Sequence, residues 1–298
     1  MAEPRFTGAG VALVTPFDGR GINESALRAL VAFHHREGTD ALVVCGSTGE
    51  AATMSPAEQR QALEIVLDAN AGKLPVIAGC GGSNTAEVVK LAVQAREAGA
   101  DALLVSAPPY NKPTQRGLIA HYRAVMDAAD LPVVVYNVPS RTAVNILPAT
   151  IAELAEDSRV IAVKEACGDI VQVAELARLV GDRVAIWSGN DDQIVPILAL
   201  GGTGTISVLA NVAPRDTSRM VHEFLAGRVA EARALQLKYL PVVKALFAEP
   251  NPIPVKAAVE WLGFEVGEVR LPLTPVSPAV RERLVAALEE VGLRPERH

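Results

Sequence analysis

The sequence is poor in aromatic residues and in cysteines, and each shortage excludes a class of protein. Phe, Trp and Tyr make up 4% of the 298 residues while half are hydrophobic, so small aliphatic side chains must fill most of the core. Cys45, Cys80 and Cys167 form no CxxC pair and have no histidine at ligand spacing, which argues against a disulfide framework and a zinc site. We expect buried free thiols, and neither a metal nor a cofactor.

A long apolar run and a basic stripe are also missing. No stretch approaches the roughly 18 apolar residues of a membrane-spanning helix, and the first ten residues lack the pattern of a signal peptide. The net charge is -6 and the 28 Lys and Arg are scattered, so no surface for nucleic acid or an anionic membrane is indicated. We expect a cytoplasmic protein that binds small molecules.

Short apolar runs alternate with longer amphipathic stretches along most of the chain. The runs are continuously apolar, as expected for parallel strands that are covered on both faces. The stretches between them have helical periodicity, and several end in glycine, where a helix C-cap is expected. The eight candidate strands are GVALVTPF, DALVVCG, PVIAGCG, DALLVSAPP, PVVVYNVP, VIAVKEA, VAIWSGND and GTISVLA.

Eight strand-helix units within about 210 residues predict an α/β fold, a closed (β/α)8 TIM barrel. An open doubly wound sheet is the alternative, although it usually has fewer strands and a glycine-rich first turn. The residues after the eighth strand have a helical pattern and are too many for one barrel helix. We therefore expect a barrel with the active site over residues 1–212, and the last barrel helix plus a C-terminal helical extension over 213–298.

In such a barrel the reactive groups lie at the carboxyl ends of the strands. Polar residues follow five of the predicted strands, and we expect all of them to face one mouth. They are Gly46, Ser47, Thr48, Gly49 and Glu50; Tyr110 and Asn111; Tyr136, Asn137 and Arg141; Lys164 and Glu165; and Ser188, Gly189, Asn190 and Asp191.

Lys164 ends an apolar strand, where burial favours a neutral, nucleophilic amine that forms Schiff bases with carbonyl compounds. A Schiff base is an electron sink, so the neighbouring carbon can lose a proton and then form or break a carbon–carbon bond. Tyr136, one strand away, is the candidate acid and base, with the hydroxyls of Ser47 and Tyr110 available to relay the proton.

Two groups of this mouth suit carboxylates. Arg141 offers a bidentate guanidinium, and Thr48 with the backbone of the GSTG turn offers further donors. Each residue alone also has a structural interpretation: an ion-paired lysine, a core tyrosine, an arginine in a salt bridge, or a plain strand-to-helix turn. We assign no chemistry to the EPNPIPVK segment, and His34 and His35 cannot share a helix face as metal ligands.

Taken together, these motifs resemble the dihydrodipicolinate synthase and N-acetylneuraminate lyase family of class I aldolases. The similarity runs from about Gly8 to Gly292 and follows the family's order and spacing. It rests on GSTGE, YNVPSRT, VKEA, SGND, GTISV and EPNPIPVK.

The resemblance implies roles for individual residues. Lys164 would form the Schiff base and Tyr136 would donate the proton. Ser47 and Tyr110 would relay it, with Tyr110 reaching in from a neighbouring subunit of a homotetramer built as a dimer of dimers. The residues implied in substrate binding are Thr48 and Ile206 for pyruvate, Arg141 for the carboxylate of the aldehyde substrate, and Gly189.

YNVPSRT and NPIPVK resemble the synthase branch, which condenses pyruvate with L-aspartate 4-semialdehyde to 4-hydroxy-tetrahydrodipicolinate in lysine biosynthesis. Ser47 stands where that branch usually has threonine, and GST is also common in the lyase branch. Two alternatives therefore remain: a pyruvate-dependent aldolase, lyase or dehydratase for a sugar acid, and a catalytically silent ligand-binding barrel.

The resemblance also bears on feedback inhibition. In relatives inhibited by L-lysine, polar side chains at the tight dimer interface hold the effector. Of the corresponding positions here, only Glu87 is plainly able to meet its ammonium group, and we expect weak inhibition or none. The others read Ala51, Pro56, Gln59, Ser83 and Pro109.

Overall fold

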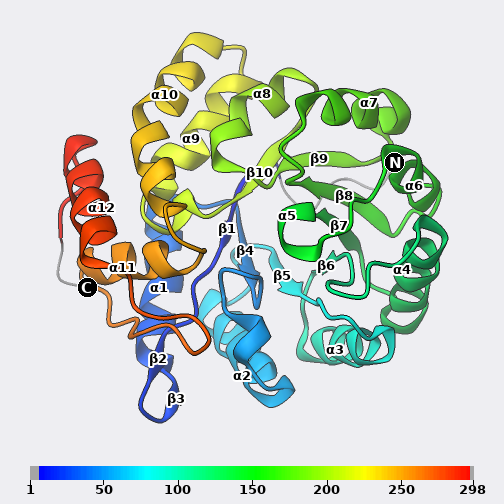
Figure 1. Ribbon diagram of the computed structural model, residues 1–298, viewed down its shortest axis with the longest axis horizontal. Helices are drawn as coiled ribbons and strands as arrows, with labels where there is room; N and C mark the ends of the chain where they lie inside the picture. The colour runs from blue at the N-terminus through cyan, green and yellow to red at the C-terminus, as the bar shows by residue number, and fades with distance from the viewer. Residues whose placement is uncertain (1–6, 296–298) are drawn as a thin grey trace.

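The computed structural model describes residues 7–295, in which eight parallel strands close into a barrel (Figure 1). β1 pairs with both β10 and β4 and so completes the ring, which confirms the (β/α)8 TIM barrel and shows the open-sheet alternative to be wrong. The barrel strands are β1 (Gly8–Ala12), β4 (Ala41–Val44), β5 (Val76–Gly79), β6 (Ala102–Ser106), β7 (Val133–Asn137), β8 (Val160–Glu165), β9 (Ala185–Ser188) and β10 (Gly204–Ser207).

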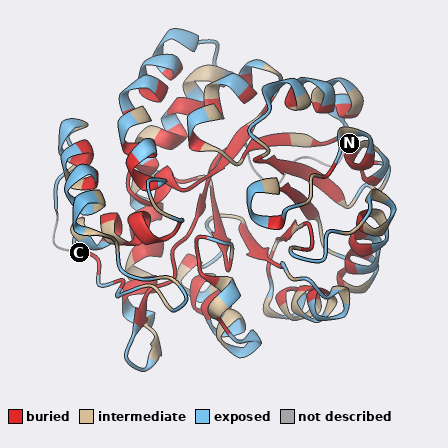
Figure 2. Cartoon of the chain, viewed as in Figure 1, coloured by how far each residue is buried: buried red, intermediate tan, exposed pale blue. Residues whose placement is uncertain are grey.

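Almost every barrel-strand residue is buried, because one face packs inside the barrel and the other meets the helices (Figure 2). The interior is filled by mostly small aliphatic side chains, as the low aromatic content predicts, with Trp187 as a fully buried exception. Tyr136 belongs to the same inner cluster, so the predicted acid and base projects into the barrel.

Helices surround the barrel, and their ends follow local sequence signals. Ser55 and Glu58 form a capping box at the start of α2, while Gly38 and Gly99 end α1 and α3 in the left-handed conformation. The surrounding helices are α1 (Glu24–Glu37), α2 (Pro56–Asn70), α3 (Thr85–Ala98), α4 (Gln115–Ala129), α6 (Pro148–Leu154), α7 (Ile170–Val180), α8 (Ile194–Ala199) and α9 (Pro214–Leu225).

The predicted helical extension follows α9, the last helix to pack on the barrel strands. It comprises α10 (Val229–Leu246), α11 (Ile253–Trp261) and α12 (Pro278–Glu290), which pack against one another. Two short features were not predicted: the hairpin β2 (Phe17–Asp18) and β3 (Gly21–Ile22), and the one-turn helix α5 (Pro139–Thr142).

Two sequence-based expectations concern the cysteines and membrane-spanning segments. All three cysteines are free thiols; Cys45 and Cys80 are buried, but Cys167 is only partly buried, so the expectation of three buried thiols is wrong for it. Cys167 lies just beyond the end of β8, in the bend that leads to α7, where the backbone leaves the barrel. Within residues 7–295, no helix has both the length and the apolar character needed to cross a membrane.

Candidate active site

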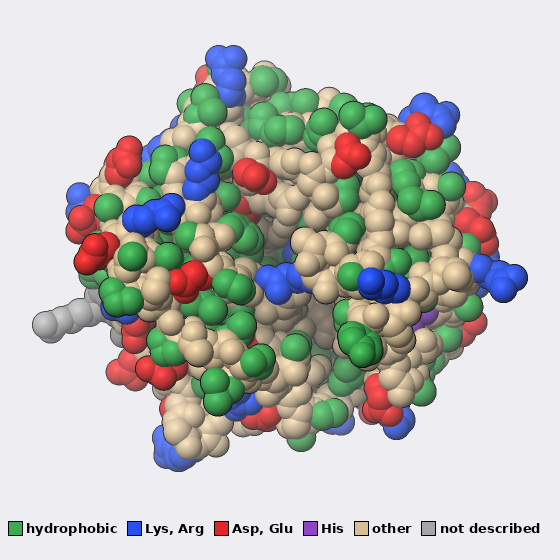
Figure 3. Space-filling model, in the orientation of Figure 1, with side chains coloured by type: hydrophobic (Ala, Val, Ile, Leu, Met, Phe, Trp, Pro, Cys, Tyr) green, Lys and Arg blue, Asp and Glu red, His purple; other side chains and the backbone are tan. Residues whose placement is uncertain are grey.

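A cavity of about 490 Å³ opens at the carboxyl ends of the barrel strands. It is hollowed into the face shown in Figure 3, near the centre of the molecule. Six of the predicted site residues line it: Ser47, Thr48, Tyr136, Arg141, Lys164 and Gly189. The segment between α10 and α11 forms the remaining wall, from Phe247 to Asn251.

Lys164 enters the cavity from β8 and is 5% exposed. Burial lowers the pKa of its ammonium group to about 7, and Arg141 also lowers it, whereas the negative charge of Asp191 opposes the shift. A large fraction of the amine is therefore neutral near pH 7. A neutral amine at the end of an apolar strand is the nucleophile that a Schiff base requires.

Tyr136 on β7 is the Cα partner of Lys164 on β8. The Nζ atom of Lys164 lies 4.3 Å from the centroid of the Tyr136 ring. Burial raises the pKa of the phenol to about 12, with the charge of Arg141 acting in the opposite direction. The phenol is protonated at neutral pH and can donate its proton to an oxygen that gains negative charge beside the lysine.

Gly189 follows β9 and leaves room for the lysine side chain. A Cβ atom at this position would lie 3.1 Å from Cε of Lys164 and 2.7 Å from Cβ of Ala166. The Gly189 N–H donates to the Glu165 carbonyl at 2.7 Å, so the backbone is held tightly here. A larger residue at position 189 would have to displace the end of β8 or the lysine.

Asn251 joins two of the predicted substrate-binding residues and was missed by the sequence analysis. Its side-chain amide donates to Oγ1 of Thr48 at 2.9 Å, and its carbonyl accepts from Arg141 at 3.0 Å. Its Oδ1 atom is buried and has no hydrogen-bond partner among the described residues. The EPNPIPVK segment, to which no chemistry was assigned, therefore contributes polar groups to the cavity.

Two predicted residues lie outside the lining of the cavity in this chain. Tyr110 is 91% exposed and adopts a left-handed backbone conformation with φ 73°. Ile206 is fully buried in the inner cluster of the barrel, and Val208, two residues further on, lines the cavity instead. Ser47 lines the cavity but is itself exposed, so its hydroxyl is accessible from solvent.

The prediction that all strand-end polar residues face the mouth is wrong for Asn137 and Glu165. Successive side chains of a strand point to opposite faces, so these neighbours of Tyr136 and Lys164 point away from the cavity. Asn137 donates to Glu165 at 3.0 Å and to Asn145 at 2.8 Å. Burial raises the pKa of Glu165, while the hydrogen bond from Asn137 opposes the shift.

Five more of the residues expected at the mouth are absent from the cavity lining: Gly49, Glu50, Asn111, Ser188 and Asp191. One oxygen of Asp191, which is 2% exposed, accepts the N–H groups of Val208 and Leu209 at 3.0 and 2.8 Å. Its carboxylate thus fixes the chain after β10. Its charge still acts on Lys164, as the opposing influence on the lysine pKa shows.

Glu50 forms a buried ion pair with Lys256 on α11, at 2.7 Å. The Glu50 carboxylate also accepts from the backbone N–H of Arg270 at 2.8 Å. Lys256 has a second hydrogen bond to the Glu268 carbonyl at 2.9 Å, and its Nζ lies 4.4 Å from the centroid of the Phe17 ring. This pair ties the turn after β4 to the helical extension.

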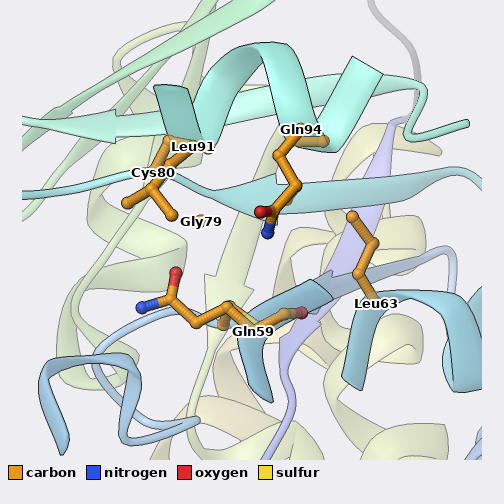
Figure 4. A pocket seen from close by; sticks show the side chains of 9 residues that line it. Gln59, Leu63, Gly79, Cys80, Leu91 and Gln94 are labelled. Carbon is orange, nitrogen blue, oxygen red and sulfur yellow. The ribbon is translucent and has the colours of Figure 1, made fainter. Parts of the chain in front are cut away.

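A second hollow lies between α2 and α3, and Gln59, Leu63, Cys80 and Gln94 are among the residues that line it (Figure 4). Its volume is about 10 Å³, which is room for about one water molecule. Burial raises the pKa of Cys45 beside it to about 12, and it raises that of Cys80 as well. This hollow is too small for a substrate. The cavity at the strand ends is the candidate active site because Lys164 and Tyr136 line it.

A buried amine facing a buried phenol at the carboxyl end of a closed (β/α)8 barrel is the arrangement of the Schiff-base, or class I, aldolases. Comparison with known proteins gives a narrower assignment. Residues 5–291 match the model of the dihydrodipicolinate synthetase family, and the chain belongs to that family.

Three similar proteins illustrate the relationship. A 4-hydroxy-tetrahydrodipicolinate synthase of Thermoanaerobacter sp. (strain X514) is 50% identical over 98% of this chain and 99% of its own length. A solved structure of a monomeric dihydrodipicolinate synthase variant is 42% identical, with a TM-score of 0.95 over 97% of this chain and 98% of the other. A lysine-bound synthase of Cyanidioschyzon merolae is 38% identical, with a TM-score of 0.95 over 98% of this chain and 100% of the other.

Proposed function

We propose that this protein is a lyase of the pyruvate-dependent class I aldolase type. It condenses pyruvate with L-aspartate 4-semialdehyde and yields 4-hydroxy-tetrahydrodipicolinate for lysine biosynthesis. The observation that carries the proposal is the pairing of Lys164 and Tyr136, a buried amine with a pKa near 7 facing a protonated phenol. Similarity to curated synthases over nearly the full length of the chain supports the choice of substrates.

The reaction begins at Lys164. Its neutral amine adds to the keto carbon of pyruvate, and loss of water leaves a protonated imine. The methyl carbon then loses a proton, and the resulting enamine attacks the aldehyde carbon, so that one carbon–carbon bond forms. Tyr136 supplies the proton that the aldehyde oxygen takes up, and Ser47 and Tyr110 relay protons to and from solvent.

The product is released from Lys164 by an intramolecular reaction of the covalent adduct. The amino group of the former semialdehyde attacks the imine carbon, which closes the ring and returns the amine to Lys164. Before this step Thr48 and Gly189 hold the pyruvate part, and Arg141 holds the carboxylate of the aldehyde part. No oxidation or reduction occurs. Apart from the two substrates and the product, the reaction involves only the water lost on imine formation and exchanged protons.

Borohydride trapping tests the proposal. Wild-type protein incubated with pyruvate and borohydride should gain the mass of a reduced pyruvate adduct, and peptide mapping should place it on Lys164. Lys164→Ala should gain none. A panel of aldehydes analysed by mass spectrometry then tests the second substrate. An adduct on another lysine, or condensation with sugar aldehydes but not with aspartate semialdehyde, would contradict the proposal.

We further propose a homotetramer in the cytoplasm. The exposure of Tyr110 supports an assembly in which this side chain reaches a neighbouring subunit, because a tyrosine that is 91% exposed gains little from its own chain. The three free thiols are consistent with a reducing compartment. We also retain the division at residue 212 between barrel and C-terminal part, since the extension follows the last barrel helix.

A further inference from the structure

We propose that Glu249 binds the α-ammonium group of the aldehyde substrate and so makes the cavity specific for an amino acid semialdehyde. The inference rests on the proposed function, since it concerns the second substrate of that reaction. Glu249 lies between α10 and α11, outside the strand ends where catalytic groups were predicted.

The charges of the cavity point to this role. Among the described residues that line it, Glu249 is the one acidic side chain, and the other charged residues there are the cations Lys164 and Arg141. A cavity that binds only keto acids and their carboxylates has no use for a carboxylate in its wall, because the negative charge would repel them. A substrate that carries an ammonium group as well explains its presence.

The carboxylate is held so that one of its oxygens stays available. Oε1 of Glu249 accepts from the backbone N–H of Ser277 at 3.2 Å and also from the Ser277 hydroxyl. Across residues 7–295, Oε2 makes neither a hydrogen bond nor an ion pair. A carboxylate fixed at one oxygen and open at the other is preorganised for an ammonium donor.

Glu249 and Arg141 line the same cavity. The Arg141 guanidinium donates to the carbonyl of Asn251, only two residues beyond Glu249, at 3.0 Å. The two opposite charges therefore flank one short segment of chain. An α-amino acid carries its ammonium and carboxylate groups on a single carbon, so Arg141 can bind the carboxylate while Glu249 binds the ammonium group.

Glu249→Gln tests the inference with two matched aldehydes. Succinic semialdehyde has the chain and the carboxylate of aspartate semialdehyde but lacks the amino group, so it can bind and condense but cannot leave Lys164 by ring closure. Its affinity is therefore measured as an inhibition constant, Ki, in the condensation assay. We expect the variant to raise KM for aspartate semialdehyde about tenfold, the effect of losing one charged hydrogen bond. Ki for succinic semialdehyde and KM for pyruvate should stay unchanged. An equal change for both aldehydes, or no change for either, would overturn the inference.

Two further variants separate charge from structure. Glu290→Gln on α12 makes the same charge change at an exposed residue outside the cavity and should leave both KM values and the Ki unchanged. Ser277→Ala removes a hydroxyl that holds Glu249 and should produce a smaller change in the same direction. If Glu249→Gln lowers only the melting temperature, its role is structural and the inference is wrong.

Failure of the inference and failure of the proposed function give different results. Wild-type condensation of pyruvate with aspartate semialdehyde tests the function, whereas the ratio of KM for aspartate semialdehyde to Ki for succinic semialdehyde in Glu249→Gln tests the inference. A wild type that traps pyruvate on Lys164 but does not use aspartate semialdehyde would overturn both.

Discussion

Lys164 and Tyr136 are Cα partners on adjacent parallel strands, and the lysine Nζ lies 4.3 Å from the centre of the tyrosine ring. The register of β7 and β8 thus brings a nucleophile and a proton donor together without help from a loop. Strand positions are more rigid than loop positions, so the pair is preorganised for reaction.

The rate of imine formation should depend on the ionisation of Lys164. Its pKa is about 7, and only the neutral amine reacts. Below this pKa the rate should rise about tenfold per pH unit, and above it the rate should level off. Borohydride trapping of pyruvate between pH 5 and pH 9 measures this.

A variant of Arg141 provides a control for the pH dependence of the trapping rate. Its positive charge lowers the pKa of Lys164, so Arg141→Met should move the profile to higher pH. Tyr136→Phe should abolish condensation while retaining a rise in trapping through the pKa of Lys164. A trapping rate that is independent of pH would contradict the assignment of Lys164 as the nucleophile.

Gly189→Ala should slow imine formation by about 10- to 100-fold, because the added methyl group crowds Cε of Lys164 and misplaces the amine. Gly19→Ala is a matched control: a Cβ there meets no atom within 4 Å, and its backbone φ is not positive. Trapping rates of the two variants give the comparison. Equal rates would show that the space beside Gly189 does not limit the lysine.

Glu50→Gln should lower the free energy of unfolding by about 3–5 kcal/mol, because it leaves the buried Lys256 ammonium without its counter-ion. The double variant Glu50→Gln/Lys256→Met should recover much of that loss, since it removes both charges. Urea denaturation of the two variants and the wild type measures both effects. A double variant less stable than Glu50→Gln would contradict this account.

Tyr110→Phe and Lys164→Ala should each be inactive if Tyr110 serves a neighbouring site. Unfolded and refolded together in equal amounts, they should regain about a quarter of wild-type activity, since half of the random dimers are mixed and each mixed dimer has one complete site. Refolding each variant alone is the control. Mixtures as inactive as the parents would show that Tyr110 does not act across an interface.

L-lysine should inhibit weakly or not at all. The amide of Gln59 already donates to the Ala51 carbonyl at 3.0 Å, and the Glu87 carboxylate already pairs with Lys90 at 2.9 Å. Both Glu87 and Gln59 are therefore engaged within this chain. Titration of L-lysine into the condensation assay measures the effect, and half-inhibition below a millimolar concentration would contradict the prediction.

The barrel and its reactive pair were predictable because both depend on local patterns. Continuous apolar runs identify buried parallel strands, and Lys164 stands out at the end of one. The partners outside the barrel were not predictable in the same way. Asn251 contacts Thr48, which is 203 residues away in the sequence. The segment around Asn251 has no helical or strand periodicity from which the direction of its side chain could be predicted. Asn137 lies away from the cavity because strand alternation turns the neighbour of Tyr136 to the opposite face.

The wall from Phe247 to Asn251 also bears on how the site is completed during synthesis. All eight barrel strands leave the ribosome before this wall does, since the last strand ends at Ser207. A nascent chain that has Lys164 and Tyr136 in register still lacks the partners that Thr48 and Arg141 find in Asn251. The site proposed for the aldehyde is therefore complete only once the last sixth or so of the chain has been made.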